Sequence, residues 1–217
     1  MFKMPELRPG RKIPWLHRNY DIIRALVDDG SRVLNLGCGD GSIFRGLQTD
    51  RGITGTGVEI DEEKIVQCVG NGVPVIQADV DRGLNDFKTG SFDFVIMNRT
   101  LQNLRRPEFV IDEMLRVGRK AIVGFPNFGF LPIRWSLFWT GRMPVTKSLP
   151  YHWYDSPNIH LCTISDFKDL CGKKRISILD SYYLRNDRAG FLINAMPNIQ
   201  ASEAIFLISR SATGRKG

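Results

Sequence analysis

The sequence predicts a doubly wound α/β protein built on a mostly parallel, seven-stranded sheet. Two observations predict this class. Short apolar runs alternate with segments of helical periodicity from residue 32 to residue 125, which is typical of right-handed strand–helix–strand units. A glycine-rich segment directly follows the first apolar run, where sheets of this kind place a ligand-binding turn.

The elements follow from the pattern in chain order. A helix is predicted over 13–27, and Gly30 ends it because glycine readily terminates helices. The next strands are predicted at 33–36, 53–60, 73–78, 92–97 and 120–125, with helices reaching residue 47 and covering 62–69 and 108–117. A helix over 163–170, capped by Thr163 or Ser165, precedes strands at 175–183 and 204–210, which we expect to form an antiparallel edge pair.

Composition favours one ordinary globular domain. We expect it to cover 13–210, with flexible tails at 1–12 and 211–217 and an insertion at about 127–160. The net charge is +7, but the basic residues are scattered, so no nucleic-acid partner is predicted. The N-terminal residues lack the pattern of a signal peptide, no apolar run is long enough to span a bilayer, and the four cysteines form no C-x-x-C pair. These features predict a cytoplasmic protein without stable membrane association or a metal centre.

The glycine loop is the first candidate binding element. It runs Gly37-Cys38-Gly39-Asp40-Gly41 after the first strand, and glycines allow close approach of a ligand to the backbone. A dinucleotide fingerprint would need a glycine at Ser42, and the G-K-[ST] of a phosphate-binding loop is absent. The loop therefore predicts a ligand site other than a phosphate cradle.

Two acids follow the next two strands. Glu59 ends the second strand, where a carboxylate can accept the hydroxyls of a ribose. Asp79 follows the third strand. Because carboxyl ends of parallel strands meet at one edge of the sheet, we expect both acids to point into one crevice with the glycine loop.

This arrangement resembles the class I S-adenosylmethionine-dependent methyltransferases, which have a Rossmann-like fold. The resemblance covers about 32–125 and includes the fourth-strand segment 91–97. It implies that the glycine loop faces the methionine moiety, that Glu59 holds the ribose and that Asp79 holds the adenine amino group. The cofactor-binding residues implied in this way are Asn35, Gly37, Cys38, Gly39, Glu59, Ile60, Asp79, Val80 and Asn98.

A closer resemblance is to the MetW family of methionine-biosynthesis proteins. It is carried by 75–79, 100–107, 113–119, 124–129, 141–147 and 153–163, and so includes the insertion. It implies a protein that binds S-adenosylmethionine or S-adenosylhomocysteine and supports the homoserine O-acyltransferase, which would be its partner. The alternative is a methyltransferase acting on a small molecule.

One position departs from both families, which have an acid before the glycine loop. Here it is Asn35, which can form hydrogen bonds but carries no charge to meet a sulfonium or ammonium group. We expect weaker cofactor binding as a result, or loss of methyl transfer.

Catalytic residues are not evident in the sequence. The candidate bases His152, His160 and Tyr154 all lie in the insertion, and His160 also fits a structural role beside a helix start. The absence of a triad excludes little, because methyl transfer relies mostly on orientation.

The insertion is rich in aromatic residues, and 114–154 contains no acid although it contains several Arg and Lys residues. Three interpretations stay open: a cap over the crevice, a surface for a protein or anionic ligand, and a short amphipathic helix at a membrane. Trp135 and Trp139 lie four apart, so in a helix they would share one face.

Overall fold

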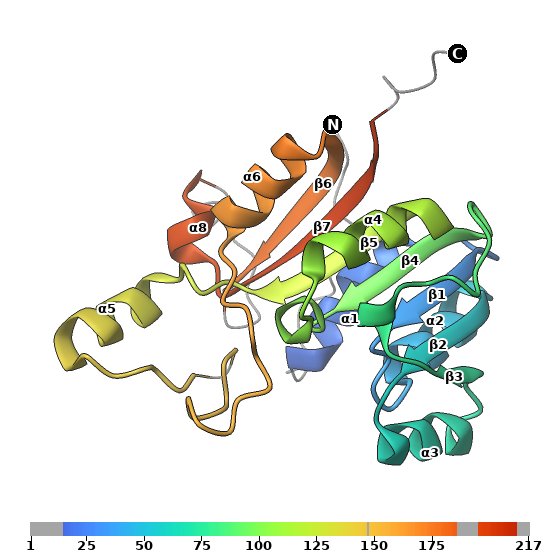
Figure 1. Ribbon diagram of the computed structural model, residues 1–217, viewed down its shortest axis with the longest axis horizontal. Helices are drawn as coiled ribbons and strands as arrows, with labels where there is room; N and C mark the ends of the chain where they lie inside the picture. The colour runs from blue at the N-terminus through green and yellow to red at the C-terminus, as the bar shows by residue number, and fades with distance from the viewer. Residues whose placement is uncertain (1–14, 147, 186–194, 212–217) are drawn as a thin grey trace.

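The computed structural model describes residues 15–146, 148–185 and 195–211. The tails predicted at 1–12 and 211–217 lie outside these residues, apart from Ser211. Within the described chain, one seven-stranded sheet forms in the order β3-β2-β1-β4-β5-β7-β6 (Figure 1). The predicted fold class is therefore confirmed.

The strands are β1 (Arg32–Leu36), β2 (Thr54–Glu59), β3 (Val75–Gln77), β4 (Phe92–Asn98), β5 (Gly118–Pro126), β6 (Ile176–Leu184) and β7 (Glu203–Arg210). The α-helices are α1 (Trp15–Leu26), α2 (Ser42–Arg51), α3 (Glu62–Gly70), α4 (Pro107–Val117), α5 (Leu131–Thr140), α6 (Ile164–Lys173) and α8 (Pro197–Gln200). Two 3₁₀ helices, η1 (Val80–Arg82) and η2 (Leu101–Asn103), follow β3 and β4. Each strand and helix predicted above is present, with ends shifted by a few residues.

One strand of the sheet, β7, runs against the other six. The pairs among β1, β2, β3, β4 and β5 are parallel, whereas β7 runs antiparallel to both β5 and β6, as predicted for the edge pair. The order reverses between β1 and β4, and such a switch point is where open α/β sheets hold ligands at the carboxyl ends of their strands. The glycine loop after β1 lies at this point.

Two apolar layers cover the sheet. On one face, α1 and α2 contribute Ile23, Phe44 and Leu47, and on the other, α4 and α6 contribute residues such as Met114 and Phe167. Alternate residues of β1 point to opposite faces, with Val33 in the first layer and Leu34 in the second. This double cover explains why the central strands read as continuous apolar runs.

Local capping sets several element ends. Thr163, one of the two predicted caps, forms a capping box with Asp166 at the start of α6. Asp61 accepts hydrogen bonds from the backbone N–H groups of Glu63 and Lys64 at the start of α3. Among the residues that the structure describes, no helix is both long and apolar enough to cross a membrane.

Candidate functional site

The glycine loop has a backbone that requires glycine. Gly37 and Gly39 have φ of 60° and 59°, in the left-handed region. A Cβ on Gly37 would also lie 2.4 Å from Oγ1 of Thr100, which follows β4. Gly37 can therefore lie against the segment after β4 only because it has no side chain.

Glu59 fastens this loop to the end of β2. Its carboxylate is buried, and Oε2 accepts a hydrogen bond from the Gly39 N–H at 2.8 Å. Oε1 accepts from the N–H groups of Ile60 and Asp61 at 2.9 and 3.2 Å. The acid that the sequence assigns to a ribose thus also holds the backbone on both sides of the crevice.

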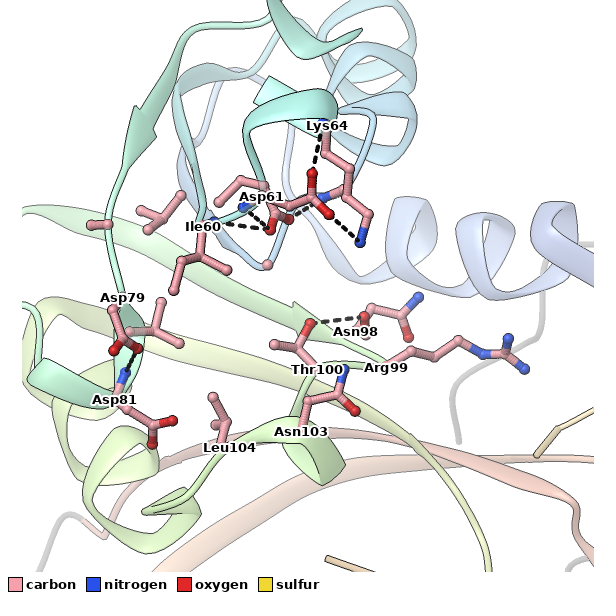
Figure 2. Close-up of a pocket in the computed structure, with 16 residues that line it drawn as sticks. Ile60, Asp61, Lys64, Asp79, Asp81, Asn98, Arg99, Thr100, Asn103 and Leu104 are labelled. Carbon is pink, nitrogen blue, oxygen red and sulfur yellow. Dashed lines mark hydrogen bonds and ion pairs between the residues drawn. The ribbon is translucent and has the colours of Figure 1, made fainter. Parts of the chain in front are cut away.

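Asp79 and Asp81 form the far end of the site. Asp79 caps η1, and its Oδ1 accepts from the Asp81 N–H at 3.0 Å. The carboxylate of Asp81 accepts from the N–H groups of Arg105 and Arg106 at 2.8–3.0 Å. These bonds tie the loop after β3 to the start of α4. Figure 2 shows Asp79 and Asp81 together, across from Asn98 and Arg99.

The segment after β4 supplies the third wall. Asn98 ends β4, and a Cβ on the neighbouring Gly124 would lie 2.2 Å from its Oδ1. Arg99 follows with φ of 59° and pairs with Glu203 of β7, and Asn19 of α1 also donates to Glu203 at 3.0 Å. This ion pair fixes the turn that leads into η2.

These three walls enclose one cavity of about 350 Å³ at the carboxyl ends of the strands (Figure 2). Its lining residues are Gly37, Gly39, Val58, Glu59, Ile60, Asp61, Lys64, Ala78, Asp79, Val80, Asp81, Asn98, Arg99, Thr100, Asn103 and Leu104. Seven of the nine cofactor-binding residues expected from the sequence are among them. Asn35 and Cys38 are not.

The two exceptions are buried beside the cavity. Asn35 is 3% exposed, in β1 between Gly57 of β2 and Ile96 of β4. Cys38 belongs to the α1–α2 layer, where its Sγ lies 3.6 Å from that of Cys68. Burial raises the pKa of both thiols, so neither is a ready nucleophile.

Sequence reasoning missed several lining residues. Lys64, Arg99, Thr100, Asn103 and Leu104 line the cavity from the first turn of α3 and from the segment after β4. The signal available was position, because the segment that follows the fourth strand must lie beside the glycine loop in this strand order.

The charges of the lining are mostly acidic. Four carboxylates face two cations, and each cation has an acidic neighbour: Lys64 lies 3.9 Å from Asp61, and Arg99 pairs with Glu203. Acceptor groups therefore dominate, which suits a ligand that brings hydroxyls, an amino group and positive charge.

The three candidate bases do not line this cavity. His152 and Tyr154 are exposed and stack on each other with ring centroids 5.3 Å apart. His160 lines a separate surface pocket with Arg105 and Phe109. Within the described residues, no group of three His, Cys, Asp or Glu side chains could hold a metal ion.

The insertion stands apart from the cavity. None of its described residues is among the cavity lining, and α5 projects away from the sheet (Figure 1). Of α5, only Ile133 is buried, within a small cluster with Phe130 and Leu149. The described part of the insertion therefore does not line the crevice, and the residues of α5 other than Ile133 are exposed or half-buried.

Comparison with solved structures defines the class of fold. An S-adenosylmethionine-dependent methyltransferase from Mesorhizobium loti is similar with a TM-score of 0.66 and 14% identity, over 89% of this chain and 98% of that one. A second from Thermotoga maritima, described as a possible histamine N-methyltransferase, has a TM-score of 0.63 and 18% identity, over 91% and 89% of the two chains. The protein therefore has the class I methyltransferase fold.

Within this class, the chain belongs to the MetW family. The family model "Methionine biosynthesis protein MetW" matches residues 17–208. The bifunctional methionine biosynthesis protein MetXA/MetW of Rhodopirellula baltica is 31% identical over 205 residues, which are 90% of this chain and 33% of that protein. The chain thus spans about a third of the length of this curated relative.

Proposed function

We propose that the protein binds S-adenosylmethionine or S-adenosylhomocysteine in the cavity and supports the homoserine O-acyltransferase of methionine biosynthesis through its insertion. The cavity carries the first half of this proposal. Gly37 and Gly39 would face the methionine moiety, Glu59 the ribose hydroxyls, and Asp79 the adenine amino group. Ile60, Val80 and Leu104 offer apolar contacts for the ring.

Three properties of the cavity favour this ligand class. It lies at the switch point of the sheet, its glycine loop permits close backbone approach, and its lining is rich in acceptors. A sulfonium and an ammonium group would both find negative potential there. The lining acids are held by hydrogen bonds that do not involve Asn35. The absence of an acid at this position in β1 therefore lowers the negative charge beside the cavity but leaves the hydrogen-bonding groups of the cavity in place.

The exposed aromatic cluster of α5 supports the second half. Trp135, Phe138 and Trp139 are 61, 76 and 65% exposed, and their rings touch edge to face. Apolar side chains gathered on a protruding element mark interaction sites, and aromatic residues anchor interfaces most strongly. In the Rhodopirellula baltica relative, a MetW portion is joined to a MetXA portion. A partner on this surface is consistent with that arrangement, and the family resemblance is the reason we propose the acyltransferase as this partner.

Methyl transfer to a small molecule is the second candidate function, favoured by the fold of the neighbours. The three sequence-based candidate bases lie outside the cavity, so a transfer that needs a base would have to use one of its lining carboxylates. The binding role requires no such group, and we prefer it.

The docking half is tested with the double change Trp135→Ala and Trp139→Ala. We expect co-purification with the homoserine O-acyltransferase to be lost, together with any increase in its activity, because two anchor residues are removed. Affinity for S-adenosylhomocysteine should stay within about twofold, since α5 contributes nothing to the cavity lining.

The matched control is Val66→Ala with Val69→Ala, which truncates two apolar side chains that are similarly exposed on α3. This control protein should still co-purify with the homoserine O-acyltransferase. A folded Trp135→Ala/Trp139→Ala protein that retains the acyltransferase, or that loses ligand instead, contradicts docking through α5. Binding of the wild-type chain to lipid vesicles, without binding to the enzyme, would point to a membrane.

A further inference from the structure

Gln102 joins the cavity to the insertion. It lies in η2, within the segment 98–104 that forms the third wall of the cavity, and five other residues of this segment line the cavity. Gln102 itself is 8% exposed and is absent from the lining. It therefore lies behind the wall, on the side where the insertion returns to the domain.

Two hydrogen bonds link its backbone to the insertion. The Gln102 carbonyl oxygen accepts from the N–H of Ile159 at 2.7 Å and from the N–H of His160 at 2.9 Å. The side chain of Gln102 links it to the cavity wall, because its Nε2 donates a hydrogen bond to the carbonyl oxygen of Arg99 at 2.6 Å. One buried residue thus contacts both a residue of the cavity wall and the end of the insertion.

The base of the insertion is anchored separately. The side chain of Asn127 is buried, donates to the carbonyl oxygens of Asn198 and Ala201 and accepts from the N–H of Ile164. The N–H of Phe128 donates to the carbonyl oxygen of Cys162 at 3.1 Å. These bonds fix the two ends of the insertion on the domain. The segment just before the second end, at residues 159 and 160, is the part that η2 holds through Gln102.

The Gln102 side chain is incompletely satisfied in this arrangement. Its Oε1 is buried without a hydrogen-bond partner, whereas buried acceptors in folded proteins nearly always have one. Arg99, its partner, has a left-handed backbone that is uncommon for a residue with a side chain. Both features cost free energy, and such costs gather at functional sites, where the surrounding structure holds a segment in place.

We infer that Gln102 is the positioning residue through which occupancy of the cavity sets the placement of the insertion. The inference rests on the proposed function, because it requires the cavity to bind a ligand. A ligand that contacts Arg99 restricts this residue, and the hydrogen bond from Gln102 Nε2 to the Arg99 carbonyl oxygen passes the restriction to Gln102. The Gln102 carbonyl oxygen then passes it to the N–H groups of Ile159 and His160. Binding free energies are coupled reciprocally, so a partner held by the insertion changes ligand affinity by the same factor.

Hydrogen exchange of single backbone amides in the full chain tests this coupling, with S-adenosylhomocysteine as the probe. In the wild-type protein, saturating ligand should slow exchange at Ile159 and His160 by about fivefold or more, the lower end of usual coupling. Gln102→Met keeps the backbone and the size of the side chain but removes the donor to Arg99. There the ligand should still bind, and the slowing should fall below about twofold. Gln67→Met on α3, where the side chain is exposed, should behave as wild type.

Ile159→Pro provides a second variant that leaves the buried glutamine intact. It removes one N–H donor at an exposed position, and the effect of ligand on the His160 amide should fall in the same way. Ligand that binds in calorimetry but leaves both wild-type amides unchanged overturns the coupling and leaves the proposed function standing. Equal slowing in wild type and Gln102→Met also overturns the role of Gln102. Absence of ligand binding in calorimetry overturns the coupling and the binding proposal together.

Discussion

Glu59→Gln tests whether one carboxylate both holds the glycine loop and binds ligand. The wild-type carboxylate accepts three backbone N–H groups, from Gly39, Ile60 and Asp61. Glutamine has one acceptor oxygen, so its best rotamer serves Ile60 and Asp61 and turns its NH₂ toward the Gly39 N–H. The loop then loses its bond to the Glu59 side chain and the Gly39 donor is left unpaired, while the bond from the Cys38 N–H to the Val58 carbonyl oxygen remains.

The magnitude follows from these three bonds. Leaving this partly buried donor unpaired costs up to about 3 kcal/mol, and loss of charge weakens the two remaining hydrogen bonds by some tenths of a kcal/mol or more. A total near 3 kcal/mol corresponds to a fall in Tm of roughly 6–12 °C for a domain of this size. Loss of the proposed ribose contact should weaken the binding of S-adenosylhomocysteine by about 1.5–3 kcal/mol, which raises its Kd roughly 10- to 150-fold.

Thermal unfolding and isothermal titration of the same preparation separate the two effects. Glu62→Gln, at an exposed position in the first turn of α3, is the matched control and should change Tm and Kd little. If Glu59→Gln lowers Tm but leaves Kd within twofold of the control, the carboxylate only holds the loop. If neither quantity changes, the three hydrogen bonds contribute nothing and the reasoning about the loop fails.

Two further predictions concern charge. Arg116 lowers the pKa of Glu113 through a side-chain hydrogen bond, so this pair stabilises the fold above the ordinary pKa of a glutamate and stops doing so as pH falls through the lowered value. Glu113→Gln should therefore lower the free energy of unfolding by about 2–4 kcal/mol at pH 7, as measured by urea titration. This difference between wild type and variant should narrow below about pH 4, and an unchanged difference at pH 3 contradicts the reasoning. Asn35→Asp should raise the affinity for S-adenosylmethionine, relative to that for S-adenosylhomocysteine, by about 2- to 10-fold in calorimetry. The new charge would act through space, because residue 35 does not line the cavity. Equal changes in the affinities of the two ligands would show that this charge does not reach the sulfonium.

Much of the fold was predictable because local patterns and global topology agree. Glycines at 37 and 39, an acid at the end of β2 and apolar runs at fixed intervals specify a parallel sheet and the edge that binds ligand. The antiparallel pairing of β6 and β7 was also predicted, because the sequence pattern places both strands after the last helix that it predicts, α6. The short helix α8 between them was not predicted.

The residues that sequence reasoning missed depend on contacts distant in the chain. Arg99 is placed by Glu203, more than a hundred residues away, and Gln102 by an insertion that returns at Ile159. Neither pairing leaves a periodic signal. Asn35 and Cys38 were predicted to bind the cofactor only because of their place in the glycine-loop motif. Alternation along β1 and the approach of Cys68 direct these side chains into the interior instead.

Isothermal titration of the full chain with S-adenosylmethionine and with S-adenosylhomocysteine tests the central claim most directly. The cavity at the carboxyl ends of β1, β2 and β4 predicts one site per chain for at least one of these ligands, weakened by Glu59→Gln and unaffected by Glu62→Gln. Absence of heat and of any shift in Tm with either ligand up to millimolar concentration would contradict it.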